Sequence, residues 1–94
     1  MRGQNKTTRK RVNHAILYRR QGGYCAGCDH HFQLRNLTID HVVPSSKGGS
    51  NDIGNLQLLC HACNQLKADG SQVQLMTELE ARGLVNRSLY GAED

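Results

Sequence analysis

The sequence predicts a small α+β domain in which a helix at each end flanks a short β segment and a cysteine-rich centre. Three observations predict this class. Apolar residues recur at helical spacing near both ends, a segment rich in β-branched residues lies between them, and the four cysteines form two close pairs. With 94 residues, the chain is expected to be one domain, too short for its apolar core alone to stabilise it.

Residues 8–21 are expected to form a basic, amphipathic helix. Apolar positions recur there at the i, i+3, i+4 and i+7 spacing of one helical face, and two consecutive glycines would end the helix. The positions of this face are Val12, Ala15, Ile16 and, through its aliphatic stem, Arg19.

The central part of the predicted domain spans residues 24–69. It begins with a tight turn at the first cysteine pair. Residues 37–43 alternate at first between apolar and polar and then become β-branched, which predicts a strand that Pro44 stops. A polar, glycine-rich loop follows, and an apolar run from Leu56 leads into the second cysteine pair and a helix through Ala68.

A last helix is expected over residues 71–83, with Ser71 as its N-cap and an end near Gly83. Its apolar face consists of Val73, Leu75, Met76 and Leu79. We interpret this face as packing, either within the domain or in a homodimer, rather than as a ligand site.

The two cysteine pairs have the C-x2-C spacing of a zinc site. Cys25 with Cys28, and Cys60 with Cys63, can each present two thiolates to one ion from a single turn. Two such pairs complete a tetrahedral shell without an open position, so we predict a structural zinc ion. His61 lies inside the second pair and is an alternative ligand, which four thiolates would make unnecessary.

The termini and the apolar runs favour a cytoplasmic protein without a membrane segment. The N-terminus lacks the apolar run of a signal peptide, and no apolar stretch is long enough to span a bilayer. Thiols stay reduced in the cytoplasm, which favours metal ligation over disulfides.

The net charge of +4 is concentrated in the first twenty residues, where there is no acid. A basic block of this kind is often a solvated tail, and it gains weight as a DNA contact when a phosphate-processing site lies nearby. The expected contacts would position DNA through its phosphates without reading its sequence: Arg9, Lys10, Arg11, Arg19 and Arg20.

Four polar residues between the cysteine pairs and just after them are candidates for hydrolytic chemistry. Cleaving a phosphodiester at neutral pH requires a base and a cation, and His41 is the candidate base because imidazole titrates near neutral pH. Asp40 and Asn64 offer hard oxygen ligands, which suit Mg²⁺ or Mn²⁺. Asn55 is a candidate to bond the backbone or ring of His41, although a turn residue fits almost as well.

Asp40 and His41 raise a geometric requirement. Adjacent residues of a regular strand point to opposite faces, so the strand must bend or end there if both side chains are to serve one ion.

Taken together, these motifs resemble the HNH endonuclease family. The resemblance covers about residues 24–69, half of the chain. It is carried by Cys25-x2-Cys28, residues 37–44, Gly48 and Gly49, Asn51, residues 55–60, Cys63 with Asn64, and Lys67.

The resemblance implies a ββα-metal fold, in which a two-stranded hairpin and a helix surround one divalent ion, here braced by zinc. His41 resembles the general base, Asp40 the acidic metal ligand, Asn55 the middle asparagine and Asn64 the last motif position. Many members have His at that last position, so this is an H-N-N variant that favours Mg²⁺ or Mn²⁺. The implied activity is nicking or double-strand cleavage of DNA to a 5′-phosphate and a 3′-hydroxyl. Lys67 lies within the motif and is a further candidate phosphate contact, although an exposed lysine of a helix is usually only solvated.

Two other functions stay open on the sequence. A non-enzymatic zinc module that binds nucleic acid through its basic arm would tolerate loss of Asp40, His41 and Asn64. A structural zinc protein that binds other proteins would show little salt-sensitive DNA binding. The order of the H-N-N motif favours the nuclease. Because so short a chain has little surface for reading base edges, we expect weak sequence preference or recognition supplied by a partner.

Overall fold

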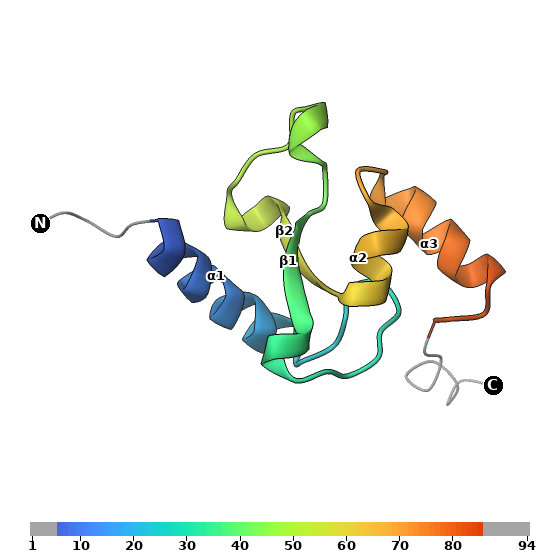
Figure 1. Cartoon of the computed structure of the whole chain (residues 1–94), viewed down its shortest axis with the longest axis horizontal. Helices are drawn as coiled ribbons and strands as arrows, with labels where there is room; N and C mark the ends of the chain where they lie inside the picture. The colour runs from blue at the N-terminus through green and yellow to red at the C-terminus, as the bar shows by residue number, and fades with distance from the viewer. Residues whose placement is uncertain (1–5, 86–94) are drawn as a thin grey trace, which may run out of the picture.

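The computed structural model describes residues 6–85 and has the predicted α+β class. Helix α1 (Lys6–Gln21) precedes a two-stranded antiparallel sheet of β1 (Leu37–His41) and β2 (Leu56–Cys60), and α2 (His61–Lys67) and α3 (Gln72–Ala81) follow. The sheet lies at the centre, with α1 on one side and α2 and α3 on the other (Figure 1). Three short 3-10 helices complete the described elements: Leu34–Asn36, Ser45–Lys47 and Ile53–Asn55.

The hairpin and α2 form a ββα unit. β1 pairs with β2 from Leu37 opposite Cys60 to His41 opposite Leu56. β1 ends at His41, two residues earlier than expected, and the chain bends at residues 42 and 43 before Pro44. The regular strand therefore ends at His41, as it must if the side chains of Asp40 and His41 are to serve one ion.

The apolar face predicted for α1 is wrong, because its residues face solvent and not the core. Val12 and Ile16 are 43% and 36% exposed, and Ala15 and Arg19 also face solvent. Leu17 is buried instead, and three partly buried side chains of the same face are polar: His14, Tyr18 and Gln21. Tyr18 donates its hydroxyl to the carbonyl of Phe32 at 2.7 Å, and Gln21 bonds both backbone groups of Leu58. Helix α1 packs through Leu17 and through hydrogen bonds to backbone groups that lie outside the β1–β2 pairing, which apolar periodicity does not indicate.

The N-cap predicted for α3 is confirmed. The Ser71 hydroxyl accepts from the amide of Gln74 at 3.1 Å, and the Gln74 side chain accepts from the amide of Ser71 at 2.9 Å, which is a capping box. Leu75 and Leu79 are buried as expected, whereas Val73 is 74% exposed and does not belong to the core face.

One core joins the elements. Leu17 of α1, leucines of both strands, Leu75 and Leu79 of α3 and the four cysteines form one buried cluster. None of the helices within residues 6–85 has the length and apolar character needed to cross a lipid bilayer.

Candidate active site

The four cysteines converge on one buried point. Cys25 and Cys28 lie in the turn after α1, Cys60 ends β2, and Cys63 lies in the first turn of α2. Their sulfur atoms lie within 4.8 Å of one another, and the Sγ atoms of Cys28 and Cys60 are 3.9 Å apart. A tetrahedral zinc ion with Zn–S bonds of about 2.3 Å separates its sulfurs by about 3.8 Å. The geometry therefore fits a four-thiolate zinc site.

The charge balance of the cluster also fits a cation. Backbone amides of Gly27 and Cys60 donate to the Sγ of Cys25 at 3.2 and 3.3 Å. A hydrogen bond from the Cys63 side chain, helped by these amides, lowers the pKa of Cys25 to about 4. Burial raises the pKa of Cys28 to about 12, and the hydrogen bond to Cys25 raises the pKa of Cys63. Four thiolates can share this volume only around a positive ion. His61 is exposed and lies outside the cluster.

Asp40 and His41 are held together by one buried lysine. The Nζ of Lys67 lies 3.1 Å from Oδ2 of Asp40 and donates to the backbone oxygen of His41 at 2.8 Å. The Lys67 side chain is 0% exposed and that of Asp40 10%. Gln57, opposite Asp40 in the hairpin, donates to the same Oδ2 at 3.0 Å. The sequence assigned Lys67 to DNA phosphate, but its ammonium is instead engaged beneath the site.

The ring of His41 is oriented by Asn51. Its Nε2 lies 2.7 Å from Oδ1 of Asn51, a residue of the long loop between β1 and β2. Because an amide oxygen only accepts, Nε2 carries the proton and Nδ1 keeps the free electron pair. In the neutral form of this ring, Nδ1 is therefore the atom that is able to accept a proton. Asn51 was part of the family resemblance, but the sequence did not indicate its contact with His41.

Asn55 holds the loop rather than the histidine. Its Oδ1 accepts from the amide of Val43 at 2.9 Å, while its Nδ2 donates to the carbonyls of Val43 and Ser50 at 3.1 and 2.9 Å. The expected bond to His41 is thus replaced by bonds to Val43, two residues later. Asn55 closes the base of the loop that carries Asn51.

Asn64 lies one turn before Lys67 on α2, and its Nδ2 donates to Oγ1 of Thr38 at 2.7 Å. Thr38 and Asp40 lie two residues apart on β1, so their side chains point to the same face of the sheet, the face that α2 covers. The bond to Thr38 uses the amide nitrogen and leaves the oxygen of Asn64 for a ligand. Asp40 likewise keeps Oδ1 beside the Oδ2 that Lys67 and Gln57 occupy. One carboxylate and one amide oxygen are hard donors that fit Mg²⁺ or Mn²⁺ completed by water and phosphate.

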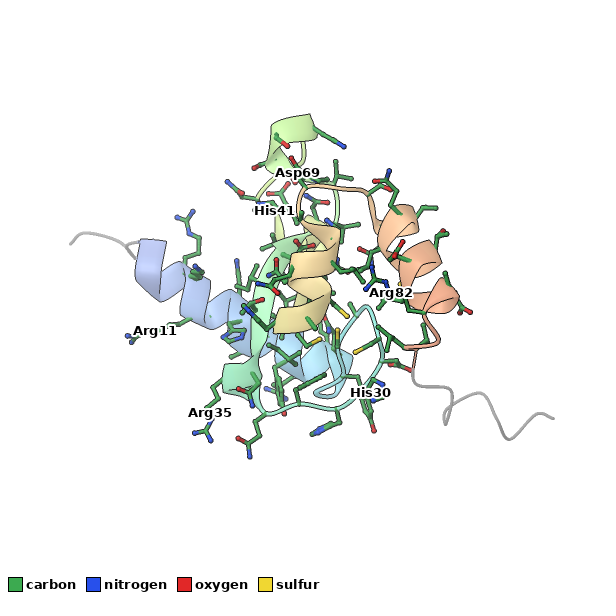
Figure 2. The ribbon with its side chains drawn as sticks, turned by 45° about the vertical axis from the view of Figure 1, so that its right-hand side comes forward. Arg11, His30, Arg35, His41, Asp69 and Arg82 are labelled. Carbon is green, nitrogen blue, oxygen red and sulfur yellow. The ribbon has the colours of Figure 1, made fainter. Side chains whose placement is uncertain are left out.

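A hollow of about 330 Å³ gives access to this centre. Asp40, His41 and Lys67 line it, together with Ser45, Ser46 and Asp69 from the adjoining turns. Figure 2 shows His41 and Asp69 at the same end of the molecule. The hollow is open and polar, and a phosphate group can approach Asp40 and the base together, whereas Asn64 lies outside the lining of the hollow.

The cations predicted to contact DNA lie along α1 and are exposed: Arg9, Lys10, Arg11, Arg19 and Arg20. They do not share one face. Lys10 and Arg11 line a groove between α1 and β1 together with Arg35, which the sequence analysis did not select. Arg2 of the basic block lies outside the described residues.

Comparisons with known proteins agree with this arrangement. A family model described as HNH endonuclease matches residues 25–79, which extends past the resemblance into α3. The CRISPR-associated endonuclease Cas9 of Corynebacterium diphtheriae is 34% identical over 67 residues, 70% of this chain. The crystal structure of the Type II-C Cas9 enzyme from Actinomyces naeslundii superposes with a TM-score of 0.63 at 26% identity over 76% of this chain. The chain spans only 6% and 8% of the lengths of these two proteins.

Proposed function

The chain belongs to the HNH endonuclease family, and on that premise we propose that it is a metal-dependent endonuclease that hydrolyses phosphodiester bonds of DNA. The observation that carries the proposal is the junction at the end of β1. There Asp40 and His41 line one hollow, with Lys67 bonded to both and Asn64 on the same helix. The two Cas9 relatives, one of them named an endonuclease, support a nuclease role.

In the proposed reaction, Nδ1 of His41 takes a proton from water, and the water oxygen forms a bond to phosphorus. The bond from phosphorus to the 3′ oxygen breaks, and that oxygen takes a proton from solvent, which gives a 5′-phosphate and a 3′-hydroxyl. Asn51 keeps the proton of His41 on Nε2. Asp40 and Asn64 would hold the divalent ion, which when bound would supply positive charge beside the phosphate and the leaving oxygen.

We infer that the N-terminal helix, the central part and the C-terminal helix form a single domain. We also infer that the protein works in the cytoplasm. The shared core of α1, the hairpin and α3 supports the first inference. The second is supported by four free cysteines whose geometry suits zinc, since reduced thiols are the state that zinc requires.

The test is the conversion of supercoiled plasmid to nicked and linear forms. Wild type with added Mg²⁺ or Mn²⁺ should cut, His41→Ala should bind DNA without cutting, and the exposed His30→Ala should cut like wild type. The ratio of nicked to linear product reports whether a homodimer cuts both strands. Cutting by His41→Ala would remove the base assignment. Salt-sensitive binding by the wild type without cleavage in either metal would favour the non-enzymatic zinc module.

A further inference from the structure

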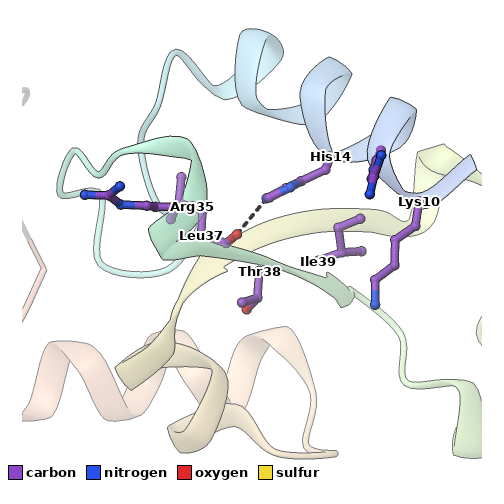
Figure 3. A pocket seen from close by; sticks show the side chains of 7 residues that line it. Lys10, His14, Arg35, Leu37, Thr38 and Ile39 are labelled. Atoms are coloured by element: carbon purple, nitrogen blue, oxygen red, sulfur yellow. Dashed lines mark hydrogen bonds between the residues drawn. The ribbon is translucent and has the colours of Figure 1, made fainter. Parts of the chain in front are cut away.

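A second hollow lies on the other side of β1, between this strand and α1. Its volume is about 330 Å³. Three cations line it, Lys10 and Arg11 from α1 and Arg35 from the 3-10 helix before β1, and its lining within residues 6–85 contains no acid. Figure 3 shows Lys10 and Arg35 at opposite ends of this groove, with His14 between them. The groove is therefore a concave surface of one charge sign.

The floor of the groove is the open edge of β1. His14 donates to the carbonyl of Leu37 at 2.7 Å, and Lys67 donates to the carbonyl of His41 at 2.8 Å, so both carbonyls point away from β2. Backbone groups two residues apart on a strand point to the same side, which places the amide and the carbonyl of Ile39 on this edge too. Ile39 lines the groove, between the two carbonyls that side chains already occupy.

The partner strand gives the same result independently. Leu58 faces Ile39 in the register, and the Gln21 side chain accepts from its amide at 2.8 Å and donates to its carbonyl at 3.2 Å. Both backbone groups of Leu58 thus point away from β1. The pair of Ile39 and Leu58 is then a non-hydrogen-bonded pair, and the amide of Ile39 is a donor directed to the open edge.

We propose that this groove binds a backbone phosphate of the substrate DNA, on the strand that is cut and close to the cleaved bond. Lys10, Arg11 and Arg35 supply the charge, and the amide of Ile39 supplies a directed hydrogen bond, the combination by which proteins position nucleic-acid backbones. Ile39 precedes His41 by two residues, about 7 Å along the strand. Since a DNA strand rises about 3.4 Å per nucleotide along its axis, the bound phosphate would lie no more than about two nucleotides from the cleaved bond. The assignment of the ligand as substrate rests on the proposed nuclease function.

Helix geometry supplies a matched control for this proposal. Arg9 and Arg19 each lie five residues from His14, which at 3.6 residues per turn places them nearly opposite the groove. Arg20 does not line the groove either. Neutralising Arg19 and Arg20 changes the net charge by the same amount as neutralising Lys10 and Arg11, but leaves the groove intact.

The experiment compares two double variants of the zinc-loaded full chain: the groove pair, Lys10→Gln/Arg11→Gln, and the control pair, Arg19→Gln/Arg20→Gln. It also compares the single variant Arg35→Gln, inside the groove, with Arg9→Gln, outside it. Binding to a short, labelled, mixed-sequence duplex is measured by fluorescence anisotropy at several salt concentrations, without added Mg²⁺ or Mn²⁺ so that no cleavage occurs. We expect the groove pair to weaken binding about tenfold and to reduce the salt slope by about 2, since each lost phosphate contact removes about 0.9. The control pair should weaken it less than about threefold. The sequence also predicts DNA contacts for Arg19 and Arg20, but these residues do not line the groove, so their loss should act only through the general charge of the helix. Addition of the duplex should also shift the amide resonance of Ile39 in a ¹H–¹⁵N correlation spectrum.

The outcomes separate this proposal from the nuclease proposal. Equal weakening by the groove pair and the control pair, or an unmoved Ile39 resonance at saturating DNA, would overturn the groove. Groove-dependent binding by a chain that never cuts plasmid would keep the groove as a DNA-backbone site and reject the nuclease activity. If wild type cuts plasmid and the groove pair cuts as well as the control pair at limiting DNA concentration, only the groove is rejected.

Discussion

The buried lysine beneath the site leads to a quantitative prediction: Lys67→Met should destabilise the zinc-loaded protein by about 3–4 kcal/mol. Removing one partner of a buried ion pair costs about 3–5 kcal/mol, because the other charge is left without compensation. Asp40 would keep its bond from Gln57 and its side chain is 10% exposed, so the low end of that range applies. The carbonyl of His41 also loses its donor at 2.8 Å, which adds about 1 kcal/mol.

The assay is urea denaturation followed by circular dichroism in excess zinc. Lys47→Met, at an exposed lysine in the 3-10 helix Ser45–Lys47, is the matched control and should change the unfolding free energy by less than about 0.5 kcal/mol. The double variant with Asp40→Asn should recover part of the loss, since it removes the uncompensated charge. If Lys67→Met costs no more than Lys47→Met, Lys67 does not hold Asp40 and His41 together as we argue.

Three further predictions concern the metal and the loop. Chelation of zinc should abolish the helical circular dichroism of the domain, whereas withholding only Mg²⁺ or Mn²⁺ should leave it folded and inactive; an unchanged spectrum after verified zinc loss would refute the stapling role. Asn55→Ala should speed hydrogen exchange at the amide of Val43 by about tenfold, and unchanged protection there would contradict the loop-closing role. Asn51→Ala should lower the rate of plasmid cleavage without weakening DNA binding, because the ring of His41 loses the contact that orients it; an unchanged rate would separate Asn51 from the base.

The features that the sequence predicted correctly depend on local chemistry. The C-x2-C spacing brings two sulfurs to one point within a single turn, whatever the rest of the chain does. Ser71 caps α3 because its hydroxyl needs only the amide of Gln74, three residues later. Both signals are contained in a few consecutive residues, so they can be recognised without knowledge of tertiary contacts.

The features that the sequence missed depend on contacts between distant segments. The core face of α1 was assigned by apolar periodicity, yet this helix docks through His14 and Gln21 onto backbone groups of Leu37 and Leu58. Lys67 on a short helix has the sequence signature of an exposed lysine. Only the fold brings a carboxylate and a carbonyl to its ammonium, and no pattern within α2 indicates this.

Helix α2 physically connects the two proposed metal centres, and its length explains why a nuclease of this size would carry a zinc site. It has seven residues, fewer than the about 12–15 that an isolated helix needs to be stable in water. Cys63 in its first turn belongs to the cysteine cluster, and the next residue, Asn64, is tied to Thr38 of β1. Lys67, one turn further, holds Asp40. Because a ligand of one centre is adjacent in sequence to a candidate ligand of the other, any displacement of α2 on zinc loss would carry Asn64 and Lys67 away from β1 together. With zinc bound, the cysteine cluster would therefore determine the geometry of the proposed hydrolytic site as well as the stability of the fold.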